Sequence, residues 1–131
     1  MRLERISSVD RGFVPRAPGA LYPRLADLRS YGTWWPGAST RSVSGDVSLT
    51  LPAGGAAAAT TERHRAGTGL FVRLEGRALA GTLEWYLEPF KDGTIVHAIV
   101  DAEPRGRWSA RRVRRFRAGI RSALVALRAG R

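Results

Sequence analysis

Few side chains of this sequence are suited to acid–base chemistry. His64 lies in the polar segment 60–65, whose facing the pattern does not determine. His97 alternates with the apolar residues of segment 94–103, which predicts that it lies on the outer face of a strand. The sequence has no cysteine, no nucleophile elbow, no phosphate-binding loop and no cluster of metal ligands. We therefore expect no metal site and no cofactor.

Positive charge is concentrated at the end of the chain. Residues 1–103 carry 12 basic and 11 acidic side chains, whereas residues 104–131 carry 10 arginines and no acid. One interpretation is an anion-binding face for nucleic acid or an anionic membrane surface. The alternative is a solvated face in a protein in which Arg outnumbers Lys by 21 to 1.

Length and composition indicate one domain, residues 1–131, large enough to bury a single core. No segment has the run of apolar residues that spans a bilayer, and the first residues lack the apolar stretch of a secretory signal. We expect a cytoplasmic protein. The sequence leaves the oligomeric state open.

A long helix is predicted over residues 109–129. Ser109 is a suitable N-cap, and Gly130 suits the left-handed position after the last turn. The apolar positions between them are spaced by 3 or 4 residues and form one stripe: Val113, Phe116, Ile120, Leu124 and Leu127. Such a stripe must be covered by another element, and we expect Phe116 and Ile120 among the most buried residues.

The rest of the chain is predicted to form a strand, a helix and then more strands. The strand covers residues 3–14, with Leu3, Val9 and Phe13 on one face, and the helix runs from Pro18 to residue 28 or 31. The further strands are expected at 41–51, 60–65, 69–75, 81–90 and 94–103, with an Asp92-Gly93 hairpin turn before the last. This order predicts an α+β domain whose curved antiparallel sheet of about six strands is covered by the terminal helix.

Three stretches of the sequence resemble the START-like (SRPBCC, Bet v 1-like) superfamily, and within it the polyketide cyclase/dehydrase-like group. The first is the helix of residues 18–31 followed by Trp34-Trp35-Pro36-Gly37. The second is the strand pair that includes residues 81–89, Asp92-Gly93-Thr94 and residues 101–104, and the third is the Arg-rich terminal helix. Residues 53–68 match poorly and look shortened.

The resemblance implies a helix-grip fold, in which the sheet wraps the last helix and leaves a ligand cavity between them. With strand parity, it implies walls made of Leu70, Val72, Leu83, Trp85, Leu87, Val96, Ala98 and Val100. Phe116, Ile120 and Leu124 would close the cavity from the helix, and Trp34 and Trp35 would lie near its mouth. The alternative is that these side chains fill a core, and the small residue Gly119 either leaves room for a ligand or lets the helix approach the sheet closely.

The resemblance also gives candidates for catalysis, because aromatic cyclases of this superfamily place an Arg and a Tyr in the cavity. The candidates here are His64, Arg65 and Arg73, with Tyr31 at the rim, and Arg63 is a further possible clamp. Catalysis would require His64 and at least one of these arginines to point inward.

Three functions follow from the sequence. The first is binding of a hydrophobic or aromatic small molecule in the cavity. The second is a cofactor-independent cyclase or dehydratase. The third is an anion-binding surface protein that acts through the terminal arginines.

Overall fold

The computed structural model describes residues 5–130, except for the side chain of Val43. Leu3, which we predicted at the start of the first strand, lies outside the described residues. The described residues form one seven-stranded antiparallel sheet in the order β1-β7-β6-β5-β4-β3-β2. Its strands are β1 (Ile6–Val14), β2 (Ser39–Val43), β3 (Asp46–Leu51), β4 (Gly55–Arg65), β5 (Gly69–Gly76), β6 (Leu79–Phe90) and β7 (Gly93–Pro104).

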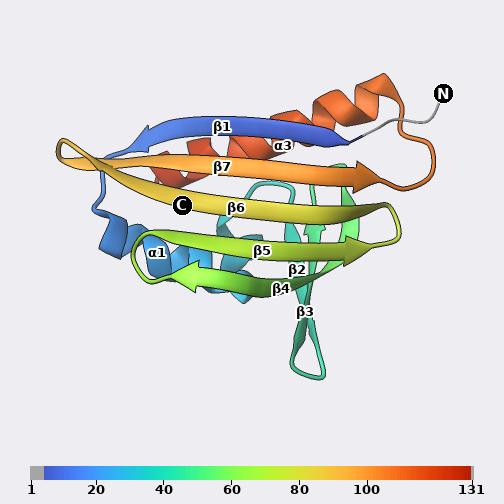
Figure 1. The fold of residues 1–131 in the computed structure, drawn as a ribbon, viewed down its shortest axis with the longest axis horizontal. Coiled ribbons are helices and arrows are strands. Elements are labelled where there is room, and N and C mark those ends of the chain that lie inside the picture. Colours follow the sequence, from blue (N-terminus) through green and yellow to red (C-terminus); the bar gives the residue numbers. More distant parts are fainter. Residues whose placement is uncertain (1–4, 131) are drawn as a thin grey trace.

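The helices lie on one side of the sheet and leave its other face open (Figure 1). They are α1 (Pro18–Ala26), the 3-10 turn η1 (Leu28–Ser30), α2 (Tyr31–Trp34) and α3 (Ala110–Arg128). We call the helix-covered face concave and the open face convex. The arrangement is the α+β helix-grip fold that the sequence predicted, with seven strands instead of about six.

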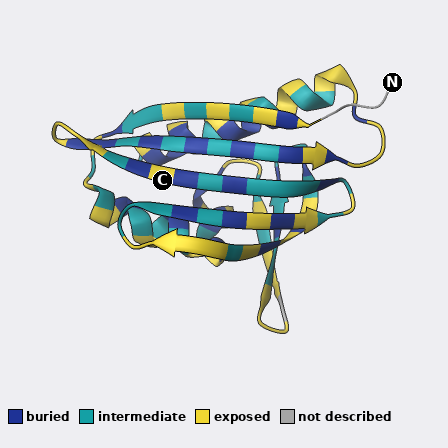
Figure 2. Cartoon of the chain, in the orientation of Figure 1, coloured by how far each residue is buried: buried dark blue, intermediate teal, exposed yellow. Residues whose placement is uncertain are grey.

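Alternation along the central strands builds the core. Along β6 and β7, buried residues alternate with more exposed ones (Figure 2), because successive side chains of a strand point to opposite faces. The inward residues of these two strands are at most 1% exposed: Leu83, Trp85, Leu87, Val96, Ala98 and Val100.

Helix α3 covers the concave face as predicted. The Ser109 side chain accepts a hydrogen bond from the Arg112 amide, which caps the first turn, and Gly130 after the helix has a φ of +80°. Phe116 and Ile120 are 1% and 0% exposed, so their predicted burial is confirmed.

Residues 41–51 form a hairpin and not the single strand that we predicted. Ser44 and Gly45 adopt positive φ angles of 51° and 87°, so the chain reverses between β2 and β3. The next strand, predicted only over 60–65, begins at Gly55, because residues 55–59 pair with β3, and its alanines alternate between buried and exposed positions. In the β6–β7 hairpin, Phe90 pairs with Gly93, so the turn residues are Lys91 and Asp92, and Lys91 has the positive φ.

In β1 the buried positions are even-numbered, whereas the apolar residues that we placed together on one face are odd-numbered. Ile6 and Val14 are buried, whereas Val9 is 70% exposed. Phe13 packs edge to face on Phe90. Strand β1 is an edge strand that contacts α3, and Gly12 on its concave side leaves room for Leu124.

Candidate functional site

All the residues that we predicted to line a cavity lie between the sheet and the helices, and all are buried. They are Trp34, Trp35, Leu70, Val72, Leu83, Trp85, Leu87, Val96, Ala98, Val100, Phe116, Ile120 and Leu124. This apolar interior is our first candidate site. Whether these residues enclose a ligand stays a prediction.

An aromatic cluster of Tyr31, Trp34, Trp35 and Trp85 lies in the middle of this interior. Its ring centroids are 5.2 to 6.4 Å apart, so every ring contacts the other three. The polar atoms of the cluster are used inside the protein. The Trp85 indole donates to the Tyr31 hydroxyl at 3.0 Å, and the Trp35 indole donates to the Gly119 carbonyl at 2.9 Å.

Tyr31 lies in the centre of the protein and not at the rim where we predicted it. Its side chain is fully buried, and its hydroxyl donates to the Leu25 carbonyl at 2.6 Å. Burial raises the pKa of Tyr31 above its ordinary value, because the phenolate would lose its hydration. Tyr31 is therefore a hydrogen-bonded neutral phenol at neutral pH and not a base.

A β-bulge in β4 decides the facing of the other three catalytic candidates. Thr61 pairs with Val72 and so belongs to the concave side, but Arg63, two residues later, pairs with Phe71 on the convex side. The extra residue reverses the parity, so Arg65 also lies on the convex face and His64 on the concave one. Without this bulge the two arginines would continue the inward parity of Thr61.

These candidates do not converge on the interior. His64 is exposed at the end of β4, where its Nδ1 atom lies 3.3 Å from the Tyr22 hydroxyl. Arg73 lies on the convex face and forms an ion pair with Glu62 at 2.7 Å. The inward pair that the enzyme hypothesis requires, His64 with Arg65 or Arg73, is therefore not present.

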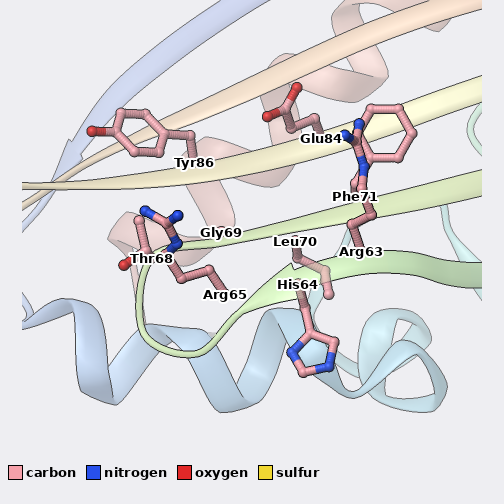
Figure 3. Close-up of a pocket in the computed structure, with 9 residues that line it drawn as sticks. All are labelled: Arg63, His64, Arg65, Thr68, Gly69, Leu70, Phe71, Glu84 and Tyr86. Atoms are coloured by element: carbon pink, nitrogen blue, oxygen red, sulfur yellow. The ribbon is translucent and has the colours of Figure 1, made fainter.

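The second candidate site is a hollow of about 360 Å³ at the β4–β5 hairpin (Figure 3). Gly69 pairs with Arg65 on one side and with Tyr86 on the other, so the missing side chain opens the surface between them. The Arg63 guanidinium lies 4.5 Å from the centre of the Phe71 ring. The hollow is lined by Arg63, His64, Arg65, Thr68, Gly69, Leu70, Phe71, Glu84 and Tyr86.

Figure 3 shows Arg63, Arg65, Glu84 and Tyr86 on one side of the strands and His64 on the other, towards α1. The two guanidinium groups of this surface can attract an anion, and the Tyr86 ring can pack on a flat group. The sheet separates them from the aromatic cluster. Arg63, Arg65 and Tyr86 therefore cannot transfer a proton to a molecule bound in the interior, and His64, although on the concave side, is exposed at the end of β4.

Two further hollows border α2 and the residues directly after it. One, of about 290 Å³, is lined by residues 32–38. The other, of about 220 Å³, lies against α3 and is lined by Pro36, Ser122, Val125, Ala126 and Ala129. Residues 32–38 include Trp34 and Trp35, so two of the interior rings lie on a segment that borders a surface hollow.

Gly119 serves packing and does not leave free space. A β-carbon added there would lie 2.6 Å from the Pro52 β-carbon, so the loop after β3 rests on the helix at this point. Trp108, which no sequence pattern placed in the core, is buried against Phe116 and donates to the Ala78 carbonyl at 3.0 Å. The Arg112 guanidinium lies 3.9 Å from the centre of the Trp108 ring, but Trp108 precedes the N-cap Ser109, so helical spacing did not indicate this contact.

Comparisons with known proteins show the fold and leave the site unassigned. No family model and no curated protein matches the sequence. Among solved structures, the di-domain ARO/CYC StfQ from the steffimycin biosynthetic pathway is 18% identical with a TM-score of 0.70. That match covers 96% of this chain and 50% of StfQ, so the chain spans half the length of that protein.

Two other solved structures match this chain along almost their full length. Ara h 8.0201 is 13% identical with a TM-score of 0.71, and the match covers 96% of this chain and 97% of that one. The Aha1 dimer from Colwellia psychrerythraea is 12% identical with a TM-score of 0.70, and both chains are 95% covered. The chain has the helix-grip fold of the START-like (Bet v 1-like) proteins, and the expected resemblance is confirmed at the level of the fold. Within residues 5–130, no helix is both long and apolar enough to cross a membrane.

Proposed function

We propose that this protein binds a flat hydrophobic or aromatic small molecule between the concave face of the sheet and α3. The observation that carries the proposal is the cluster of Tyr31, Trp34, Trp35 and Trp85, which places four aromatic rings inside a helix-grip fold. Ring faces and edges of this kind pack on another flat ring at little entropic cost. The solved structures of similar fold include an ARO/CYC protein, which is consistent with an aromatic ligand.

The ligand would enter through the segment that carries Trp34. Helix α2 has only four residues, it follows a 3-10 turn, and Gly37 after it has a φ of +81°. Trp34 is held through its indole nitrogen by one bond of 3.3 Å to the Ser30 hydroxyl, whereas Trp35 has the shorter bond to Gly119. Trp34 is therefore the ring that we expect to move when a ligand inserts.

The interior is better suited to binding than to reaction. Among the described residues, the only buried side chain outside the apolar and aromatic classes is Thr94, and its hydroxyl donates to the Arg16 carbonyl. Proton transfer needs a base within about 3 Å of the acidic hydrogen, and Tyr31 is held as the neutral phenol. Burial alone contributes about 25 cal/mol per Å² of apolar surface, so a ligand that buries roughly 300 Å² gains about 7.5 kcal/mol before the cost of association.

A neutral flat probe, N-phenyl-1-naphthylamine, tests this proposal, because it has no charge for the arginines to attract. We expect saturable quenching of tryptophan fluorescence, an increase in probe fluorescence and a rise in melting temperature. Binding should weaken at least about tenfold, or about 1.4 kcal/mol, in Ala98→Leu, because Ala98 pairs with Trp85 and the larger side chain would occupy the proposed ligand position.

The matched control is His97→Leu, which adds an apolar side chain to the opposite face of the same strand and should keep wild-type affinity. Thermal melts establish that both variants are folded. Wild-type protein that shows no change in fluorescence or melting temperature up to the solubility of the probe would overturn the proposal. Equal weakening in the two variants would overturn the location of the site.

A further inference from the structure

The outer face of α3 carries guanidinium groups without counter-charges. Five of its arginines are exposed: Arg111, Arg114, Arg115, Arg121 and Arg128. Within the described part of the chain, none of them forms an ion pair with a carboxylate. No acidic residue occurs after Glu103, so the neighbouring sequence does not neutralise them either.

Three of these arginines form a row along one side of the helix. Arg114, Arg121 and Arg128 are seven residues apart, which is about two helical turns and about 10.5 Å. Arg121 and Arg128 line a groove between α3 and the edge strand β1. The row therefore follows the seam at which the helix meets the sheet.

The groove has an apolar floor and a basic rim. It measures about 240 Å³ and is lined by Asp10, Arg11, Gly12, Phe13, Arg121, Leu124, Val125 and Arg128. Three of these residues are arginines, and the one carboxylate, Asp10, accepts a hydrogen bond from the Ser8 hydroxyl at 2.9 Å. The seam thus combines positive charge with accessible apolar surface.

Helix α3 also carries one of the two most exposed large aliphatic side chains of the described chain, since Val125 is 69% exposed. Val125 lies in the same groove as Arg121 and Arg128. We call the surface formed by Arg11, Arg114, Arg121, Val125 and Arg128 the seam surface.

We propose that the seam surface docks on a bilayer that contains anionic phospholipids. The guanidinium groups would bind lipid phosphates, since their fork of donors matches phosphate oxygens, and Val125 and the groove would contact the apolar part of the interface. A nucleic acid fits less well, because its backbone offers no apolar surface to the groove. The one aromatic ring of the groove, Phe13, is half-buried and packs edge to face on Phe90, and the described seam surface has no Asn or Gln to read base edges.

Co-sedimentation with vesicles tests this proposal on the whole protein. We expect binding to vesicles of equal parts phosphatidylcholine and phosphatidylglycerol, little binding to pure phosphatidylcholine, and loss of binding between 50 and 500 mM NaCl. Because a basic residue near such a surface contributes about 1 kcal/mol, Arg121→Gln/Arg128→Gln should bind about 25-fold more weakly.

The matched control is Arg63→Gln/Arg65→Gln, which removes the same charge from the convex face and should stay within about twofold of wild type. Val125→Asn should also weaken vesicle binding while leaving any binding to duplex DNA unchanged. Equal binding to both kinds of vesicle would overturn the proposal, as would equal weakening in the two arginine variants. Stronger binding to DNA than to anionic vesicles, with no effect of Val125→Asn on vesicle binding, would assign the surface to nucleic acid instead.

Discussion

At the scale of single residues, the Tyr31 hydroxyl connects the aromatic cluster to the backbone. It donates to Leu25 and accepts from Trp85, so Tyr31→Phe leaves a buried carbonyl and a buried indole N–H without partners. Each such group costs about 1–3 kcal/mol, and we expect the variant to lose about 2–4 kcal/mol of unfolding free energy. Urea unfolding at pH 7 measures this loss.

The same residue predicts a dependence of stability on alkaline pH. Burial raises the pKa of Tyr31 in the folded state, whereas in the unfolded chain the phenol ionises near pH 10. The contribution of Tyr31 to the free energy of unfolding is therefore fully present below about pH 10. It is lost as the pH rises further, by up to about 1.4 kcal/mol per pH unit. Tyr31→Phe should lose stability less steeply between pH 10 and 11 and run parallel to wild type below pH 9. Identical slopes above pH 10 would contradict this role.

The face of the sheet to which a residue points could be predicted only where the strand has no bulge. Parity placed Leu83, Trp85 and Val96 correctly in the interior, because β6 and β7 pair without interruption. The facing of Arg65 could not be predicted, because the bulge in β4 depends on how that strand pairs with β5. The burial of Tyr31 follows from the packing of α2 under the sheet, which no local pattern specifies.

At the scale of the elements, Gly119 sets how closely α3 can approach the loop after β3. Alanine favours a helix over glycine by about 1 kcal/mol, but its β-carbon would lie 2.6 Å from Pro52. We expect Gly119→Ala to destabilise the protein by about 1–2 kcal/mol net and to shift the Trp35 emission, because Trp35 donates to the Gly119 carbonyl. Chemical unfolding followed by fluorescence measures both effects.

The control for this prediction is Gly19→Ala in α1, where an added β-carbon meets no atom within 4 Å. That variant should be stabilised by up to about 1 kcal/mol, since alanine restricts the unfolded chain. A neutral or stabilising Gly119→Ala would mean that Pro52 moves aside freely.

Elements whose own sequence carries the start, periodicity and stop signals could be predicted, whereas elements that form only by pairing with other strands could not. The cap, stripe and terminal glycine of α3 agree with one another, so its bounds were predicted to within one residue. The β2–β3 turn was missed because Ser44-Gly45 interrupts an otherwise continuous strand pattern without a second turn signal. Strand β4 begins with alanines, which have a low strand propensity, and only its pairing with β3 and β5 makes it a strand.

At the scale of the whole molecule, the charge is distributed unevenly, and this predicts a response to salt. Of the net charge of +11, residues 104–131 contribute +10 and residues 1–103 contribute +1. These arginines repel one another over about 30 Å at 10 mM salt but only about 8 Å at 150 mM. The melting temperature should therefore rise with NaCl over this range, by roughly 2–5 °C.

Differential scanning calorimetry at several NaCl concentrations measures this response. Arg121→Gln/Arg128→Gln should melt higher than wild type at 10 mM NaCl and gain less from added salt. A melting temperature that falls with salt would mean that the surface ion pairs, such as that of Arg5 with Asp101, outweigh the repulsion.

The pairing of β1 with β7 has a consequence for synthesis on the ribosome. Ile6 pairs with Ala102, so among the described strands β1 has one neighbour in the sheet, β7, which is synthesised 96 residues after it. Until β7 has left the exit tunnel, β1 has no strand to pair with, although β2 to β5 can already form hairpins with each other. The unpaired backbone of β1 is then open to other chains, and a chaperone that holds extended segments would protect it during this interval.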